Sequence, residues 1–122
     1  MIDIDDFKRV NDRLGHTAGD QALQAVSAVI ERSIRTIDIA ARYGGEEFVV
    51  ILPETPLDSA AIVAERIRGG AAENAGSIPV TVSIGVAELD NTDAAPGALL
   101  DRADAALYGA KRSGKNRVEL AG

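Results

Sequence analysis

The stretch Arg42-Tyr43-Gly44-Gly45-Glu46-Glu47-Phe48 separates two apolar runs, residues 37–41 and 48–52. Two extended runs joined across paired glycines predict a β-hairpin, because a tight two-residue turn needs the positive φ angles that glycine tolerates. Glu46 and Glu47 begin an otherwise apolar strand. Since side chains alternate along a strand, we expect these two on opposite faces of the sheet. On this pattern alone, the hairpin carries nothing more than solvated acids at its tip.

Length and composition limit the class of protein. The chain has 122 residues, 46% hydrophobic and 3% aromatic, which predicts one domain, residues 1–122, with a core of Ala, Val, Ile and Leu. The net charge of −6 argues against a nucleic-acid polymer or an anionic membrane surface as partner. No apolar run approaches the ~20 residues of a membrane span, so we expect no membrane contact from this domain.

The chain has no cysteine and a single histidine, His16. The lack of cysteine excludes disulfides, thiolate zinc sites and a cysteine nucleophile, and it is compatible with a cytoplasmic location. A hydrolase triad or a multi-histidine metal site would depend on His16 alone. We therefore expect any chemistry to use carboxylates and a hard, oxygen-binding cation such as Mg²⁺.

Alternating and helical periodicities predict five strands and four helices. The predicted elements, in chain order, are strand 1–5, helix 6–14, a loop over 15–20 in which Asp20 caps the next helix, helix 21–35, the two strands of the hairpin, helix 57–71 with its end loosened at Gly69-Gly70 and Ala75-Gly76, strand 80–86, a helix from Leu100 that closes at Ser113-Gly114, and strand 116–120. This order predicts an α+β sandwich close to a ferredoxin-like arrangement, with helices covering a mixed, largely antiparallel sheet. Strand 1–5 has the pattern of a central strand, whereas a chain terminus normally lies at the surface. We therefore expect a fragment without its natural lead-in segment.

Acidic residues are expected to meet in such a sheet. The first strand can lie beside the hairpin, which brings Asp3 or Asp5 near Glu46. Crowded carboxylates repel one another and raise each other's pKa unless a cation neutralises them. Mg²⁺ takes one or two protein carboxylates and completes its shell with water and phosphate oxygens.

Cations that could reach a polyphosphate lie at both ends of the chain. The helix after the first strand starts near Lys8, and free amides at a helix start favour a phosphate. Lys111 and Lys115 follow the last long helix. Each lysine alone is more commonly a solvated helix end. Together with the acids, however, they indicate metal-assisted phosphoryl or nucleotidyl transfer.

Several short motifs occur together in a fixed order. They are Asp3-Ile4-Asp5-Asp6-Phe7-Lys8, Asn11-Asp12, Gly15-His16, Gly19-Asp20, Arg42-Tyr43-Gly44-Gly45-Glu46-Glu47-Phe48, Val82-Ser83-Ile84-Gly85-Val86, Arg102-Ala103-Asp104, Tyr108, Ala110-Lys111 and Gly114-Lys115-Asn116. With these motifs the chain resembles the GGDEF family of diguanylate cyclases over residues 3 to 118. That family condenses two GTP into cyclic di-GMP and pyrophosphate on a nucleotidyl-cyclase-like fold. The family's Asp-x-Leu-Thr-x-Leu-x-Asn-Arg stretch, which precedes the first strand, is missing here.

The resemblance implies a metal site and a catalytic residue. Asp3, the Ile4 carbonyl and Glu46 would hold Mg²⁺, with Mn²⁺ as an alternative ion. Glu46 would also accept the proton of the attacking ribose 3′-hydroxyl. Lys8 would stabilise charge at the phosphates.

The resemblance also implies the substrate-binding residues, which are Phe7, Lys8, Asn11, His16, Asp20, Lys111 and Lys115. Lys115 stands where arginine is frequent in the family, so a bidentate phosphate contact would be weaker there. Asn11 and Asp20 match the guanine-binding positions. A carboxylate accepts hydrogen bonds from N1–H and the amino group of guanine, and a site that leaves such a group unpaired rejects other bases. His16 either contacts the substrate or only supports its loop.

Assembly and control follow from the same resemblance. Each domain would hold one GTP, so catalysis would require a homodimer with the two sites face to face. Arg35-Thr36-Ile37-Asp38 matches the RxxD site that binds inhibitory cyclic di-GMP, and Arg66 matches a further contact to that product. As a bare pattern, Arg35 and Asp38 are only a local ion pair of little energetic value. A sensory or receiver domain is expected elsewhere in the parent chain.

Two other functions stay open on the sequence. One is a catalytically silent module of the same fold that binds GTP or cyclic di-GMP. The intact Gly44-Gly45-Glu46-Glu47-Phe48 argues against it. The other is a ferredoxin-like structural or regulatory domain with unrelated partners, which would leave the pairing of Asp3 with Glu46 unexplained.

Overall fold

The computed structural model describes residues 1–73 and 78–122. The described elements are β1 (Ile2–Ile4), α1 (Phe7–Leu14), α2 (His16–Ser33), β2 (Ile39–Arg42), β3 (Glu47–Ile51), α3 (Leu57–Glu73), β4 (Val82–Val86), α4 (Pro96–Arg112) and β5 (Val118–Leu120). The predicted order of strands and helices is confirmed. The predicted loosening at Gly69-Gly70 is wrong, because α3 runs through both glycines to Glu73 and Gly70 lies closely against Val29 of α2. The predicted loosening at Ala75-Gly76 lies outside the described residues.

The strands form one five-stranded sheet in the order β2-β3-β1-β4-β5. β1 is therefore central, as its sequence predicts, and pairs antiparallel with both β3 and β4. The hairpin pairs β2 with β3, and β5 runs parallel to β4. The sheet is mixed and largely antiparallel, which confirms the predicted fold class.

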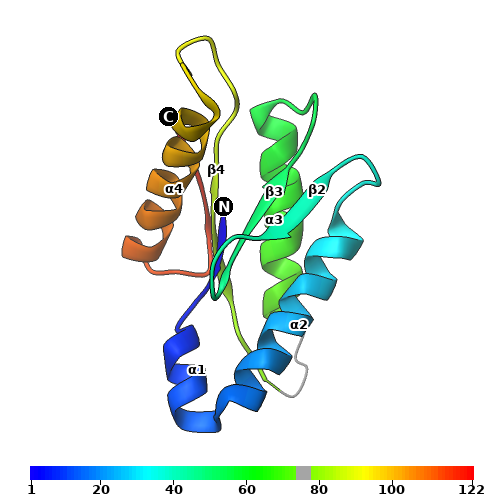
Figure 1. The fold of residues 1–122 in the computed structure, drawn as a ribbon, viewed down its shortest axis with the longest axis vertical. Coiled ribbons are helices and arrows are strands. Elements are labelled where there is room, and N and C mark those ends of the chain that lie inside the picture. The colour runs from blue at the N-terminus through cyan, green and yellow to red at the C-terminus, as the bar shows by residue number, and fades with distance from the viewer. Residues whose placement is uncertain (74–77) are drawn as a thin grey trace.

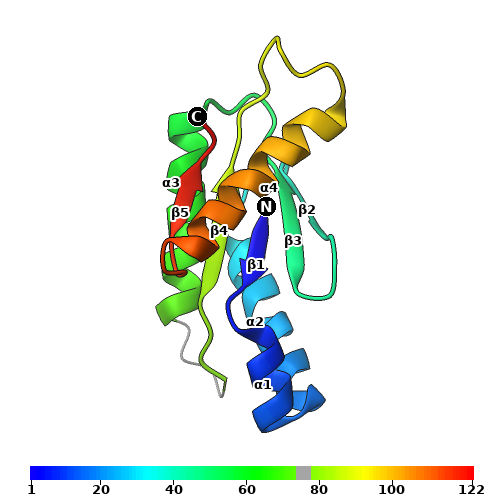
Figure 2. The ribbon, with the colours of Figure 1, turned by 90° about the vertical axis from the view of Figure 1, so that its left-hand side faces the viewer.

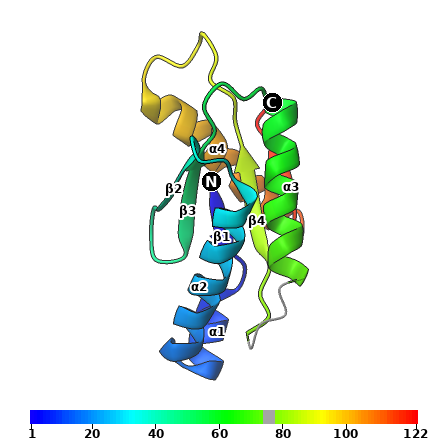
Figure 3. The same cartoon turned by 90° about the vertical axis from the view of Figure 1, so that its right-hand side faces the viewer.

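Helices cover both faces of this sheet. In Figure 1 β4 and the start of the chain lie between α4 on one side and α2 with α3 on the other, and the β2–β3 hairpin passes across α3. Figure 3 views the face covered by α2 and α3, and Figure 2 shows α4 crossing in front of β1 and β4. Because side chains alternate along a strand, β1 turns buried Ile2 and Ile4 toward α2 and α3 and turns Asp3 toward α4, where Lys111 meets it.

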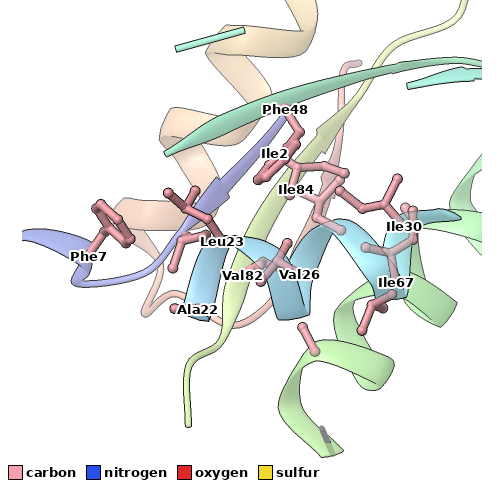
Figure 4. Close-up of a cluster of buried hydrophobic side chains, with 14 residues drawn as sticks. Ile2, Phe7, Ala22, Leu23, Val26, Ile30, Phe48, Ile67, Val82 and Ile84 are labelled. Carbon is pink, nitrogen blue, oxygen red and sulfur yellow. The ribbon is translucent and has the colours of Figure 1, made fainter. Parts of the chain in front are cut away.

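The main core lies between the sheet and the helices α2 and α3 (Figure 4). Its side chains are mostly aliphatic, as the low aromatic content requires; they include Ile2, Ile4, Val26, Ile30, Phe48, Ile67, Val82 and Ile84. A smaller cluster of Met1, Ala103 and Leu107 packs beneath α4. Each buried aliphatic side chain contributes about 1.5–3 kcal/mol to folding. The core therefore stabilises the sheet whose strands β1 and β3 carry Asp3 and Glu47.

Two further local predictions are wrong. The hairpin loop has four residues, 43–46, and neither Gly44 nor Gly45 has a positive φ. The loop closes instead through the Tyr43 and Gly44 amides, which both donate to the Glu47 carbonyl. The loop predicted over 15–20 is also wrong, because α2 already begins at His16. Gly15, at a φ of +89°, separates α1 from α2 in one residue, so Asp20 lies inside the helix and caps nothing.

None of the helices in the described part of the chain combines the length and the hydropathy needed to cross a bilayer.

Candidate functional site

The carboxyl end of β1 is the meeting point of the predicted site. Asp3 faces Glu47 across the β1–β3 pair, and the Ile4 amide donates to the Glu46 carbonyl at 3.2 Å. Helix α4, near the carboxyl terminus of the sequence, places the Lys111 ammonium 2.7 Å from Asp3 Oδ1 and 2.9 Å from Asp5 Oδ1. Residues of β1, of the hairpin and of α4 therefore meet at the carboxyl end of β1.

The carboxylates of Asp3, Glu46 and Glu47 repel one another, which disfavours their ionised forms. Burial and the neighbouring charge of Asp3 raise the pKa of Glu46, and the charge of Glu47 adds to the effect. Burial and Asp3 raise the pKa of Glu47 in the same way. The pKa of Asp3 is raised mainly by burial, although Lys111 opposes the shift. Three acids with raised pKa values are a local surplus of negative charge that a cation would relieve.

These residues fit a hard divalent cation. Asp3 offers a carboxylate and Ile4 a carbonyl oxygen, and Glu46 is near enough to Asp3 for their charges to interact. Within residues 1–73 and 78–122, no group of three or more His, Cys, Asp or Glu side chains is placed to hold a metal ion. An ion here would therefore rely on the carbonyl, on water and on phosphate oxygens, which is the coordination that Mg²⁺ prefers.

Asp5, which the sequence offered only as an alternative to Asp3 beside Glu46, is a buried anchor between β1, β4 and α4. Its carboxylate accepts hydrogen bonds from Thr81 Oγ1 at 2.6 Å, Ser83 Oγ at 2.6 Å and the Asn116 amide at 3.0 Å, besides the Lys111 ammonium. Burial raises the pKa of Asp5, but these hydrogen bonds outweigh it and the net pKa is lowered. The alternation of Thr81 and Ser83 along an otherwise apolar strand was a signal that could have indicated such a partner.

Replacing Asp5 with asparagine is expected to lower the free energy of unfolding by about 2–4 kcal/mol at pH 7, because several buried donors lose a charged acceptor. A carboxyl whose folded pKa is lowered stabilises the fold above its unfolded pKa. It loses that contribution as pH falls through the folded value. The difference in unfolding free energy between wild type and Asp5→Asn should therefore stay constant down to about pH 4 and become smaller below that pH. Urea denaturation across this pH range measures it, with Asp12→Asn on the exposed side of α1 as control.

The residues predicted to contact phosphate gather where α1 begins. Asp6 precedes the helix at a φ of +54°, and its Oδ1 accepts a 2.6 Å hydrogen bond from the Lys115 ammonium. Lys8 is exposed in the first turn of the same helix. The structure thus brings Lys8, Lys111 and Lys115 to the same end of β1, from opposite ends of the chain.

The predicted guanine-binding residues lie where α1 packs on α2. An added Cβ at Gly19 would lie 1.9 Å from Asn11 Oδ1 and 3.2 Å from Phe7 Cζ. Asn11 therefore lies against α2 one residue before Asp20. Phe7 is 8% exposed and belongs to the core. His16 is exposed at the start of α2.

Gly19→Ala is expected to displace the Asn11 amide and, with Asn11 in its predicted guanine-binding role, to weaken GTP binding about tenfold or more. The gain of about 1 kcal/mol of helix propensity from alanine offsets the tight contact of its Cβ with the buried Phe7 ring, so the net change in stability should be small; thermal unfolding of the same variant checks this. Isothermal titration with a non-hydrolysable GTP analogue measures the affinity. Gly69→Ala, which meets open space on α3, is the matched control. An unchanged affinity would mean that Asn11 does not contact the base.

A second polar cluster lies at the far end of α2. Arg35 Nη2 lies 2.9 Å from Asp38 Oδ1, and the Asp38 side chain is only 1% exposed. The same guanidinium nitrogen donates to the Pro53 carbonyl and to Thr55 Oγ1. Arg66 Nη1 reaches the Ser33 carbonyl at 3.0 Å. The three residues predicted for the inhibitory site therefore all border the end of α2, and the Arg35 side chain is 55% exposed.

A mixed sheet with a central acidic strand, helices on both faces and a Gly-Gly hairpin beside that strand defines an α+β fold of the nucleotidyl-cyclase-like class. Comparison with known proteins supports this class. The active GGEEF domain of a diguanylate cyclase from Vibrio cholerae superposes with a TM-score of 0.94 at 35% identity, over 99% of this chain and 80% of that one. The GGDEF domain of DgcB from Caulobacter crescentus, in complex with c-di-GMP, superposes with a TM-score of 0.90 at 40% identity, over 98% and 74%.

Residues 1–117 match the family model "Diguanylate cyclase, GGDEF domain", and the chain belongs to this family. Diguanylate cyclase A of Treponema denticola is 46% identical over 98% of this chain and 34% of its own length. The response regulator PleD of Caulobacter vibrioides is 46% identical over 97% of this chain and 28% of its own length. The chain therefore spans about a third of these relatives.

Proposed function

We propose that this domain catalyses the condensation of two GTP into cyclic di-GMP, with release of pyrophosphate. The observation that carries the proposal is the convergence of Asp3, Ile4 and Glu46 at the end of β1, with Lys8, Lys111 and Lys115 around the start of α1. Acids that repel one another beside a cluster of lysines suit a metal-bound polyphosphate. Membership of the GGDEF family supports the reaction type.

The residues divide the work as follows in this proposal. Asp3, the Ile4 carbonyl and Glu46 would hold Mg²⁺ or Mn²⁺, which when bound would neutralise charge on the phosphate oxygens. Glu46 accepts the proton of the 3′-hydroxyl of one GTP. The 3′-oxygen attacks the α-phosphorus of the other GTP, and the bond from that phosphorus to pyrophosphate breaks. The raised pKa of Glu46 makes its carboxylate a better proton acceptor. Lys8 stabilises the charge that develops on the phosphates.

The proposed reaction needs two copies of the domain. Each copy holds one GTP, and two phosphodiester bonds form between the two nucleotides, so two sites have to face each other in a homodimer. Correct mutual positioning of the reactants can supply several kcal/mol of the catalytic effect. Because GTP is the substrate, we place the domain in the cytoplasm, within a longer protein that carries a sensory or receiver domain.

Incubation of the full-length protein with GTP and Mg²⁺, followed by nucleotide chromatography, tests the proposal. Cyclic di-GMP and pyrophosphate are the expected products, and chelation of the metal should stop their formation. Tight GTP binding without any product would contradict the proposed activity and favour the catalytically silent module. ATP serves as the control nucleotide, since Asn11 and Asp20 are assigned to guanine.

We further propose that cyclic di-GMP inhibits the enzyme through Arg35, Asp38 and Arg66. Arginine pairs bidentately with phosphate, and Asp38 holds the exposed Arg35 guanidinium in a defined position. The hydrogen bond of Arg66 to Ser33 brings a second arginine to the same end of α2.

Arg35→Ala is expected to increase the half-inhibitory concentration of cyclic di-GMP about tenfold or more, because one charged, bidentate phosphate contact is lost. Arg35→Lys should show most of this effect, since an ammonium cannot make the planar two-point contact. Initial rates at increasing cyclic di-GMP measure it, with Arg32→Ala in the last turn of α2 as control. Inhibition that is unchanged in Arg35→Ala would place the regulatory site elsewhere.

A further inference from the structure

Lys111 is surrounded by three oxygen atoms from consecutive residues. Its ammonium lies 2.7 Å from Asp3 Oδ1, 2.9 Å from Asp5 Oδ1 and 3.3 Å from the Ile4 carbonyl oxygen. A lysine ammonium has three N–H donors and no acceptor. Each of the three donors can therefore be matched with one oxygen at the end of β1.

Two of these three oxygens belong to residues assigned to the divalent ion. Asp3 and the Ile4 carbonyl are the proposed metal ligands, and Lys111 contacts both of them. A divalent ion on the same Asp3 Oδ1 and Ile4 carbonyl oxygens would lie about 2.0–2.1 Å from each, within the space that the ammonium fills at 2.7 Å and 3.3 Å from them. Their like charges add to this steric conflict. The ammonium and the divalent ion are therefore alternatives at Asp3.

The third oxygen differs from the other two. Asp5 is held by Thr81, Ser83 and the Asn116 amide, so its carboxylate keeps its position whether or not Lys111 moves. Lys111 stands in the last turn of α4, and its side chain is 24% exposed. The flexible four-carbon side chain can swing away from Asp3 toward the start of α1, where Lys8 and Lys115 lie.

We propose that Lys111 takes the place of the divalent ion in the free protein and leaves Asp3 when a triphosphate arrives. This inference rests on the proposed function, since it assigns the metal to Asp3 and Ile4. The triphosphate supplies a new partner for the ammonium, and the released Asp3 and Ile4 oxygens accept the metal. Metal and nucleotide therefore bind together, and the free protein has a low affinity for the metal alone.

The test measures Mn²⁺ binding to the full-length protein without nucleotide, from the loss of the free-ion electron paramagnetic resonance signal. Lys111→Met is expected to bind Mn²⁺ about tenfold or more tightly than wild type, because the competing cation is gone. Lys115→Met removes the same charge from a side chain that pairs with Asp6 instead, so it controls for the change in overall charge and should differ from wild type by less than about threefold. Lys111→Arg keeps the positive charge and should keep the affinity low.

Equal Mn²⁺ affinity in Lys111→Met and Lys115→Met would overturn the proposal, and so would the absence of Mn²⁺ binding in every variant. This readout is independent of turnover. A protein that makes no cyclic di-GMP can still show the exchange, and an active protein whose Lys111→Met variant binds Mn²⁺ no better refutes the exchange alone.

A second measurement covers the case in which Lys111→Met folds poorly. Without Lys111 each of the three oxygens loses one donor, although Asp5 keeps its bond from Ser83. The variant should therefore melt at a lower temperature than wild type, and Mn²⁺ should raise its melting temperature more than that of wild type. Lys111→Gln, which keeps a hydrogen-bond donor without the charge, should show the same larger response to Mn²⁺. An equal Mn²⁺ response in Lys111→Gln and wild type would contradict the exchange.

Discussion

Glu46→Gln is expected to lower the rate of cyclic di-GMP synthesis by about 10³-fold or more, because an amide can neither accept the ribose proton nor bring a negative charge to the metal. The stability of the fold should not decrease. The pKa of Glu46 is raised by burial and by Asp3, so its charged form destabilises the folded state at neutral pH. Removing that charge should leave the melting temperature unchanged or slightly higher.

Product chromatography at saturating GTP and thermal unfolding of the same samples measure both effects. Glu73→Gln, an exposed acid at the end of α3, is the matched control and should keep wild-type activity. Activity that survives in Glu46→Gln would remove this residue from the mechanism. A lost activity accompanied by a large fall in melting temperature would mean that Glu46 acts through the fold instead.

Gly85→Ala is expected to cost about 3 kcal/mol or more of unfolding free energy. An added Cβ would lie 2.1 Å from the Ala103 carbonyl oxygen and 2.3 Å from the Leu107 amide nitrogen. Both are backbone atoms, which cannot rotate out of the way as a side chain can, so α4 would have to move off β4. Because α4 also carries Lys111, GTP affinity should fall as well.

Urea denaturation measures the change in stability. Gly109→Ala lies on the same helix and meets open space, so it should instead stabilise the protein by about 0.5–1 kcal/mol. If the two variants unfold at the same urea concentration, α4 does not pack as closely on β4 as the structure indicates.

The sequence was most informative where the signal is local. The alternation of Val82–Val86 and the spacing of Leu23, Val26 and Ile30 predict their strand and helix, since burial on one face imposes a period of two or of about 3.6. The boundaries were less certain. One glycine, Gly15, replaces the predicted loop before α2, because its positive φ reverses the chain within a single residue.

For the candidate site, the sequence supplied the residues but not their contacts. The family motifs name Asp3, Glu46 and Lys111, yet Lys111 meets Asp5 across a separation of 106 residues. The role of Asp5 as a buried anchor was missed for the same reason, because its partners Thr81 and Ser83, just before and within β4, are 76 and 78 residues away in the chain.

Local patterns in the amino-acid order were sufficient for the succession of elements and the central position of β1, and the motifs were sufficient for the family. Strand pairing and the packing of α4 determine which charged groups share a space: they place the Lys111 ammonium on the oxygens of Asp3, Ile4 and Asp5. The physical reason is that periodicity depends on near neighbours, whereas the energy of a charge depends on every group within a few ångströms, however distant in the chain.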